Sequence, residues 1–206
     1  KTVLNLTIKE AMRRVGVYYY FLPTYTQGKK IIWDGIDGDG FKFLNHFPEK
    51  ILNGEPNSTE MKINFRNGSI FQVIGTDNFN SIVGPNPIGC VFSEYSLQNP
   101  TAWELVRPIL AENGGWAIFV YTPRGHNHGW HMYQMARNNP DWLCELRTVD
   151  DTGAITKEAI EQCRREDMSE DMIQQEFYCS FEASIVGAYY AKEMRMMRAD
   201  GRICGV

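Results

Sequence analysis

Three short runs of consecutive apolar residues constrain the fold of this chain more than any other feature. They span residues 17–22, 88–92 and 116–121. A strand that is covered on both faces, as in a parallel sheet, has such a continuous apolar pattern, whereas a half-exposed strand alternates apolar with polar residues. Stretches with helical periodicity separate the runs, and one of them, residues 3–14, precedes the first. This order of elements predicts an α/β fold with a mostly parallel central sheet.

A β-hairpin is the clearest departure from parallel pairing. Asn67-Gly68 joins two alternating segments, residues 61–65 and 69–74, and this dipeptide favours the tight turn of a hairpin. The sequence therefore predicts an antiparallel addition to the sheet. Further helices are expected at residues 26–34, 100–110, 127–138, 156–167 and 169–177, and a half-buried strand is expected at residues 142–149.

Composition limits the classes of protein to which the chain can belong. Of its 206 residues, 43% are hydrophobic and 22% are charged, which is typical of a folded globular protein and not of a disordered one. Lys and Arg number 21 and Asp and Glu 25, so the net charge is −4 and a strongly basic nucleic-acid-binding surface is excluded. A local basic patch, or DNA contact shared across an oligomer, stays open. No apolar run reaches the roughly 18 residues of a membrane helix, and we expect no secretory leader.

The cysteines predict neither a zinc site nor a disulfide framework. They are odd in number and widely spaced, and no CxxC pair occurs. We expect buried, reduced thiols in a cytoplasmic protein. They are Cys90, Cys144, Cys163, Cys179 and Cys204.

Three places in the sequence could carry chemistry. In a parallel sheet, ligands bind beyond the carboxyl ends of the strands. Ser93-Glu94 follows the second apolar run, residues 122–125 follow the third, and Lys1-Thr2 precedes the first helix. We expect Thr2, Glu94 and Thr122 to meet at one edge of the sheet.

Lys1-Thr2 matches the end of a phosphate-binding loop, G-x-x-x-x-G-K-[ST]. In that loop the lysine reaches the β- and γ-phosphates, the threonine hydroxyl binds Mg²⁺, and the helix N-terminus holds the anion. The glycines of the motif would precede Lys1. We therefore expect the chain to be a piece of a longer protein, although Lys-Thr alone carries no specificity.

Glu94 stands at the end of an apolar strand, where an acid can activate a water molecule next to a nucleotide. The preceding slot, in which an aspartate would support Mg²⁺, holds Ser93, whose neutral hydroxyl could hold a metal-bound water. The alternative is that Glu94 is simply an exposed acid at a strand end.

Thr122 and Arg124 lie in a turn after the third run. A hydroxyl at a strand tip can sense the γ-phosphate, and Arg124 could contact phosphate, DNA or a partner subunit; the alternative is a Pro-Gly turn with a solvated arginine. His128 and His131 share helical spacing, but no cysteine or carboxylate completes a metal site with them. The acidic turn at residues 34–40 lacks the glutamate at position twelve of a calcium loop.

Taken in order, these places resemble the ATPase domain of the phage terminase large subunit, the motor that packages DNA into procapsids. No single motif is specific, whereas the ordered set is. It comprises Lys1-Thr2, residues 20–25 with Gln27, residues 75–78, 84–87 and 91–95, Trp103 with Pro108, residues 121–125 with Asn127 and His128, and residues 175–177 and 187–190.

The resemblance implies a RecA-like P-loop ATPase fold with an additional strand and helices on both faces of the sheet. It assigns ATP phosphates to Lys1 and Thr2, Mg²⁺ to Thr2 and, through water, to Ser93, and the catalytic water to Glu94. Thr122 and Arg124 fall in the motif that couples hydrolysis to DNA movement. The implied partners are double-stranded DNA, the portal protein and the terminase small subunit, in a homo-oligomeric ring in the host cytoplasm and without a membrane.

The sequence departs from the family pattern at three points. Ser93 replaces an aspartate, Val83 stands where many relatives carry an arginine before the glycine that matches Gly84, and most of the phosphate loop lies upstream. We expect residues 1–206 to be the ATPase domain, with 168–206 leading toward a nuclease domain outside the chain. The predicted function is an ATP-hydrolysing packaging motor, weak or inactive as this fragment. The alternatives are a non-catalytic module that binds DNA or a partner, or another additional-strand, helicase-like ATPase.

Overall fold

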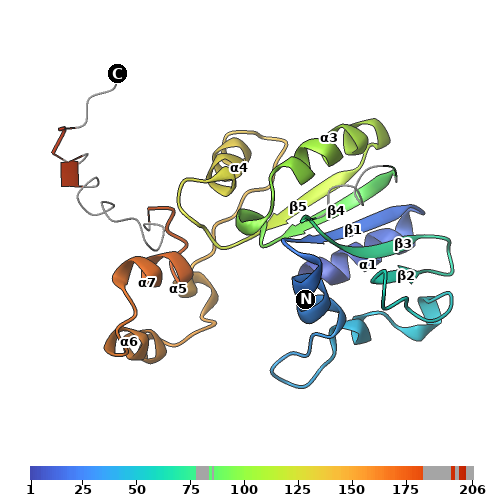
Figure 1. The fold of residues 1–206 in the computed structure, drawn as a ribbon, viewed down its shortest axis with the longest axis horizontal. Coiled ribbons are helices and arrows are strands. Elements are labelled where there is room, and N and C mark those ends of the chain that lie inside the picture. Colours follow the sequence, from blue (N-terminus) through green and yellow to red (C-terminus); the bar gives the residue numbers. More distant parts are fainter. Residues whose placement is uncertain (78–83, 85, 183–195, 198–199, 203–206) are drawn as a thin grey trace. The chain divides into compact units, whose positions relative to one another are not determined.

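The computed structural model describes residues 1–77, 84, 86–182, 196–197 and 200–202, and they belong to two compact units. The first unit spans residues 1–121 and contains the sheet, and the second spans residues 122–206 (Figure 1). The sequence suggested a single domain over the same residues.

The sheet of the first unit has five strands in the order β2-β3-β1-β4-β5. Neighbours β3, β1, β4 and β5 run parallel, and only β2 is antiparallel, paired with β3. This arrangement confirms the predicted α/β fold and the hairpin at Asn67-Gly68. The strands are β1 (Val17–Leu22), β2 (Lys62–Asn64), β3 (Ile70–Gly75), β4 (Pro87–Ser93) and β5 (Trp116–Val120).

Helices α1 (Thr2–Arg13) and α3 (Thr101–Asn113) cover opposite faces of this sheet (Figure 1). Alternate residues of β1 point to opposite faces. Tyr18 and Tyr20 join the apolar cluster that contains Leu4 of α1. On the other face Phe21 stacks on Phe92, which packs against Trp103 of α3. The aromatic run that opens β1 is therefore core, as its continuous apolar pattern predicts.

The hairpin turn also caps the C-terminal end of α1. The last carbonyls of a helix have no partner within it. The Ser69 hydroxyl donates to the Ala11 carbonyl at 2.7 Å, and the Asn67 side-chain amide donates to the same oxygen at 2.8 Å. The Tyr18 hydroxyl donates to the Arg14 carbonyl at 2.7 Å. The turn thus fixes the helix to the start of β1 and β3.

Short helical turns complete the first unit. The helix expected at residues 26–34 begins one residue earlier and divides into an α-helical turn and a π-helical turn. Helix α3 continues through Pro108 and ends three residues beyond the expected end. The short elements are α2 (Tyr25–Gly28), η1 (Lys29–Trp33), η2 (Phe43–His46), η3 (Glu49–Ile51) and η5 (Tyr95–Leu97).

The described part of the second unit contains helices and no strand. The strand predicted for residues 142–149 is wrong: no strand of this unit is present among the described residues to pair with it, and Leu143 is 89% exposed. Val149 instead opens α5, where it packs with Ile160 and Ile173. The helices are α4 (His128–Arg137), α5 (Val149–Thr152), α6 (Lys157–Arg165) and α7 (Glu170–Glu176).

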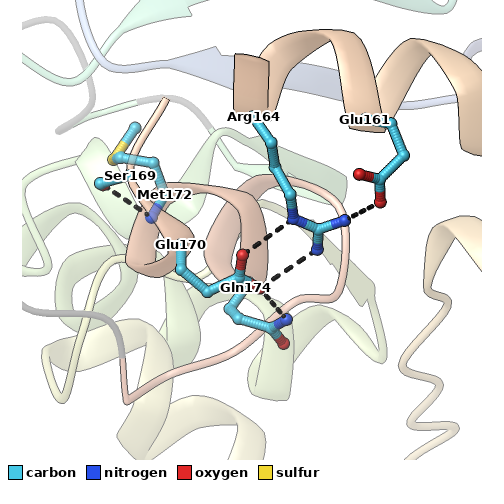
Figure 2. A network of polar contacts seen from close by, with 6 residues as sticks. All are labelled: Glu161, Arg164, Ser169, Glu170, Met172 and Gln174. Atoms are coloured by element: carbon cyan, nitrogen blue, oxygen red, sulfur yellow. Dashed lines mark hydrogen bonds and ion pairs between the residues drawn. The ribbon is translucent and has the colours of Figure 1, made fainter. Parts of the chain in front are cut away.

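Arg164 links α6 to α7, as Figure 2 shows. Its guanidinium donates to both carboxylate oxygens of Glu170, at 2.9 and 3.2 Å, and pairs with Glu161 one turn earlier. Gln174 donates to Glu170 at 2.8 Å. The start of the segment 168–206 is therefore a helix packed within the second unit.

The described cysteines are free thiols, as predicted. Cys90 is buried in β4, whereas Cys144, Cys163 and Cys179 are half-buried, and Cys204 lies outside the described residues. In the part of the chain that the structure describes, no helix is both long and apolar enough to span a bilayer.

Candidate nucleotide site at the carboxyl edge of the sheet

Lys1 and Thr2 form the N-terminal end of α1. Thr2 is the first helical residue and is exposed. The Lys1 ammonium forms an ion pair with Asp37, which lies after β1 in the turn that follows η1. The Asp37 pair raises the pKa of Lys1, and the hydrogen bond from Lys1 lowers the pKa of Asp37. Nothing in the sequence pattern pointed to Asp37 as the partner of Lys1.

The same ion pair locates the N-terminus of α1 relative to the sheet. Asp37 belongs to the segment that the chain enters after leaving β1, so the start of α1 lies at the carboxyl end of β1 (Figure 1). Because β4 runs parallel to β1, Glu94 directly after β4 lies at this edge too. Thr2 and Glu94 therefore lie at one edge of the sheet.

Glu94 has a left-handed backbone conformation, with φ 59° and ψ 40°. Residues with side chains adopt this region rarely, and such strain clusters at functional sites. The Glu94 amide donates to the Val120 carbonyl at 2.7 Å, and its carbonyl accepts from the Leu97 amide at 2.9 Å. The half-buried glutamate is therefore held where the chain turns sharply away from the sheet.

Ser93 contacts an aromatic hydroxyl from the apolar run of β1. Burial raises the pKa of Tyr20, a hydrogen bond with Ser93 lowers it, and the Glu94 charge raises it. The phenol of Tyr20 therefore lies beside both residues at the end of β4. No sequence signal distinguished it from its aromatic neighbours in β1.

The ends of β1 and β3 are locked together next to this site. The buried Thr76 hydroxyl donates to the carbonyls of Leu22 and Pro23, both at 3.3 Å. The Asp77 carboxylate accepts from the Tyr25 amide at 3.2 Å. The motif residues 75–77 therefore act through the backbone that follows β1.

Thr122 and Arg124 belong to the second unit. Thr122 is its first residue, so its position relative to Glu94 stays a prediction. The Arg124 guanidinium pairs with Glu176 of α7, and both side chains are about one-third exposed or less. Asn127 caps α4 by accepting from the Gly129 amide at 2.9 Å. An intramolecular ion pair, and not a solvated turn, is the environment of Arg124 in this structure.

Some of the sequence-based expectations concern residues whose structure is not described. Val83 and residues 187–190 are among them. Among the residues that are described, no group of three or more His, Cys, Asp or Glu side chains could hold a metal ion, in line with the unfavourable spacing around His128 and His131.

Comparisons with known proteins identify one curated relative and several structural relatives. No family model matches the chain. The terminase large subunit of Escherichia phage T5 is 27% identical over 154 residues, which are 69% of this chain. The chain spans only 35% of that protein.

Solved structures of large terminases share the fold. The large terminase ATPase domain of Thermus phage P74-26 matches with a TM-score of 0.67 at 17% identity, over 84% of this chain and 80% of that one. The large terminase of a thermophilic bacteriophage, in complex with ATP-gamma-S, matches with a TM-score of 0.64 at 14% identity, over 86% of this chain and 43% of that one. The sequence match and the shared fold together confirm the resemblance of this chain to the ATPase domain of phage terminase large subunits.

Proposed function

We propose that this chain is the ATP-hydrolysing motor domain of a phage terminase large subunit and drives double-stranded DNA into a procapsid. The observation that carries the proposal is Glu94: a half-buried carboxylate in a left-handed turn, at the same sheet edge as the N-terminus of α1. An acid beside a helix N-terminus is the arrangement that phosphoryl transfer to water requires, because the helix end binds phosphate and the acid activates the water.

The residues at this edge fit ATP and Mg²⁺. The exposed Thr2 hydroxyl, at the start of α1, is an oxygen ligand of the kind that Mg²⁺ prefers, and Ser93 would contribute through a water. The bound Mg²⁺ would neutralise charge on the phosphoryl oxygens. Glu94 would orient and deprotonate the attacking water. Thr122 and Arg124 would couple the reaction to DNA movement.

Lys1 must exchange partners to reach a phosphate. Its side chain is 57% exposed where it pairs with Asp37, and exposed ion pairs contribute little to stability. A nucleotide phosphate carries more charge than one carboxylate, so it can compete with Asp37. Expressed alone, the 206-residue polypeptide is expected to bind and hydrolyse ATP weakly, because a terminal lysine is not held in a rigid loop.

The proposed partners are those of a packaging motor: double-stranded DNA, the portal protein, the terminase small subunit, and further copies of this chain in a ring. The proposed location is the host cytoplasm, where procapsids are filled. The T5 relative is a terminase large subunit, and this supports the proposal.

A non-catalytic module that binds DNA or a partner is the second candidate. It is favoured by Ser93, which is neutral and hydrogen-bonded to Tyr20 in the position where an acid would support Mg²⁺. This candidate predicts nucleotide-independent binding and no phosphate release.

Thr2→Val in the full-length natural protein tests the site. We expect it to weaken Mg²⁺-dependent ATP affinity by about tenfold or more, because the hydroxyl ligand is lost while the shape is kept. Thr101→Val is the matched control, since Thr101 is also exposed and also opens a helix. Equal ATP affinity and phosphate release in both variants would remove Thr2 from the site, and a wild-type protein without phosphate release would favour the binding module.

A further inference from the structure

Gln98 is a buried polar side chain at the nucleotide edge whose role the sequence did not indicate. The residue is 3% exposed. The amide nitrogen donates to the Ser93 carbonyl at 2.7 Å and to the Phe21 carbonyl at 3.1 Å. Both hydrogens of the amide are used, which fixes its orientation. Its oxygen is buried and accepts no hydrogen bond from the described residues, so the two donated bonds account for a polar side chain at this position.

The two carbonyls lie where pairing between β1 and β4 ends. Phe21 and Phe92 form the last pair of the β1–β4 register, and Ser93 is the last residue of β4. Beyond this point the two chains separate, toward α2 and η5 respectively. Gln98 therefore bridges the ends of both strands after the backbone ladder stops.

The bond to Ser93 also holds the peptide unit that joins Ser93 to Glu94. The N–H of this unit donates to the Val120 carbonyl, and its C=O accepts from Gln98. Both sides of the peptide plane are thus fixed immediately before the left-handed Glu94. A conformation that is sparsely populated persists only where its surroundings determine it, and Gln98 supplies one of the two bonds that do so here.

We propose that Gln98 is the positioning residue for Glu94: it fixes the Ser93–Glu94 peptide so that the carboxylate is directed at the attacking water. This inference rests on the proposed ATPase function. Gln98 itself does not contact the reacting atoms. Loss of its donated bonds leaves the nucleotide-binding residues in place and changes the orientation of Glu94.

Gln98→Met in the full-length natural protein tests the proposal, because methionine keeps the length of the side chain and removes both donors. We expect kcat for phosphate release to fall by about tenfold or more, with the ATP Kd within about twofold of the wild-type value. Gln72→Met is the matched control, since the Gln72 amide also donates to a backbone carbonyl, that of Glu60, away from this edge. A kcat of Gln98→Met that equals that of Gln72→Met would overturn the proposal.

A double variant separates positioning from general loss of structure. In a Glu94→Gln background, Gln98→Met is expected to cause no further loss of the residual turnover, because both changes act through one carboxylate. A further loss of about tenfold would show that Gln98 acts by another route and would overturn the proposal.

Folding is checked by thermal unfolding. If Gln98→Met does not unfold cooperatively, Gln98→Asn decides, because it keeps the amide and shortens its reach: a lower kcat at unchanged Kd supports the proposal, and an unchanged kcat overturns it. Full turnover by Glu94→Gln would instead contradict the proposed function, whichever result the Gln98 variants give.

Discussion

Replacing Gly75 with alanine should strongly destabilise the first unit. A Cβ at Gly75 would lie 2.1 Å from the Tyr25 amide nitrogen, 2.4 Å from the Asp77 carboxylate and 2.6 Å from the Thr24 carbonyl carbon. Two of these are backbone atoms, which cannot rotate away. The matched control is Gly38→Ala, whose Cβ would meet nothing within 4 Å.

The magnitude follows from two contributions. Overpacking against fixed atoms costs about 1–3 kcal/mol. Moving β3 away from the segment after β1 also breaks the exposed hydrogen bond from the Tyr25 amide to Asp77, which contributes about 0.5–1.5 kcal/mol. The free energy of unfolding should therefore fall by about 2–4 kcal/mol, a large part of the roughly 5–15 kcal/mol that stabilises a typical domain.

Urea unfolding followed by tryptophan fluorescence measures this change, and the buried Trp33 of the first unit contributes to the signal. With a slope of about 2 kcal/mol per molar urea, the midpoint of Gly75→Ala should drop by about 1–2 M. Gly38→Ala should stay within about 0.5 kcal/mol of the wild type. A Gly75→Ala midpoint that matches the control would refute the steric argument.

Two further predictions concern the same unit. Ser69→Ala removes a buried hydroxyl that donates to the Ala11 carbonyl, but Asn67 still donates to that oxygen, so unfolding free energy should fall by about 1–2 kcal/mol; no change in the urea midpoint would show that Asn67 alone suffices. Burial raises the pKa of Tyr95 to about 12, so the native state holds this proton more tightly than the unfolded chain, whose tyrosines titrate near about pH 10. Stability from this group should be fully present below about pH 10 and lost as the pH rises toward about 12, which urea midpoints at about pH 8, 10 and 11 would show, and constant midpoints would contradict.

The parts of the fold that follow from local pattern were predictable. The continuous apolar runs indicated β1, β4 and β5 nearly to the residue, and Asn67-Gly68 indicated the hairpin. Glu94 was found because an acid after a buried strand stands out in the sequence. The pattern misled at residues 142–149, because alternation predicts a strand only if a neighbouring strand exists, and the described part of the second unit supplies none.

Long-range contacts account for the features that no local pattern reveals. β5 has a fully apolar sequence but is half-buried at the edge of the described sheet. The Lys1–Asp37 pair joins residues that are distant in sequence, and Gln98 reaches back to a carbonyl of β1. Such contacts depend on how the strands are ordered, and strand order was not predicted.

Glu94→Gln in the full-length natural protein is the most direct test of the central claim, that this carboxylate activates water for ATP hydrolysis. The change removes the charge and the basicity and keeps the size of the side chain. Steady-state phosphate release and ATP affinity should be measured side by side, with Glu104→Gln on α3 as the control. We predict that Glu94→Gln keeps its ATP Kd within about twofold and loses about a hundredfold or more in kcat, while the control keeps both. Full turnover by Glu94→Gln would contradict the claim.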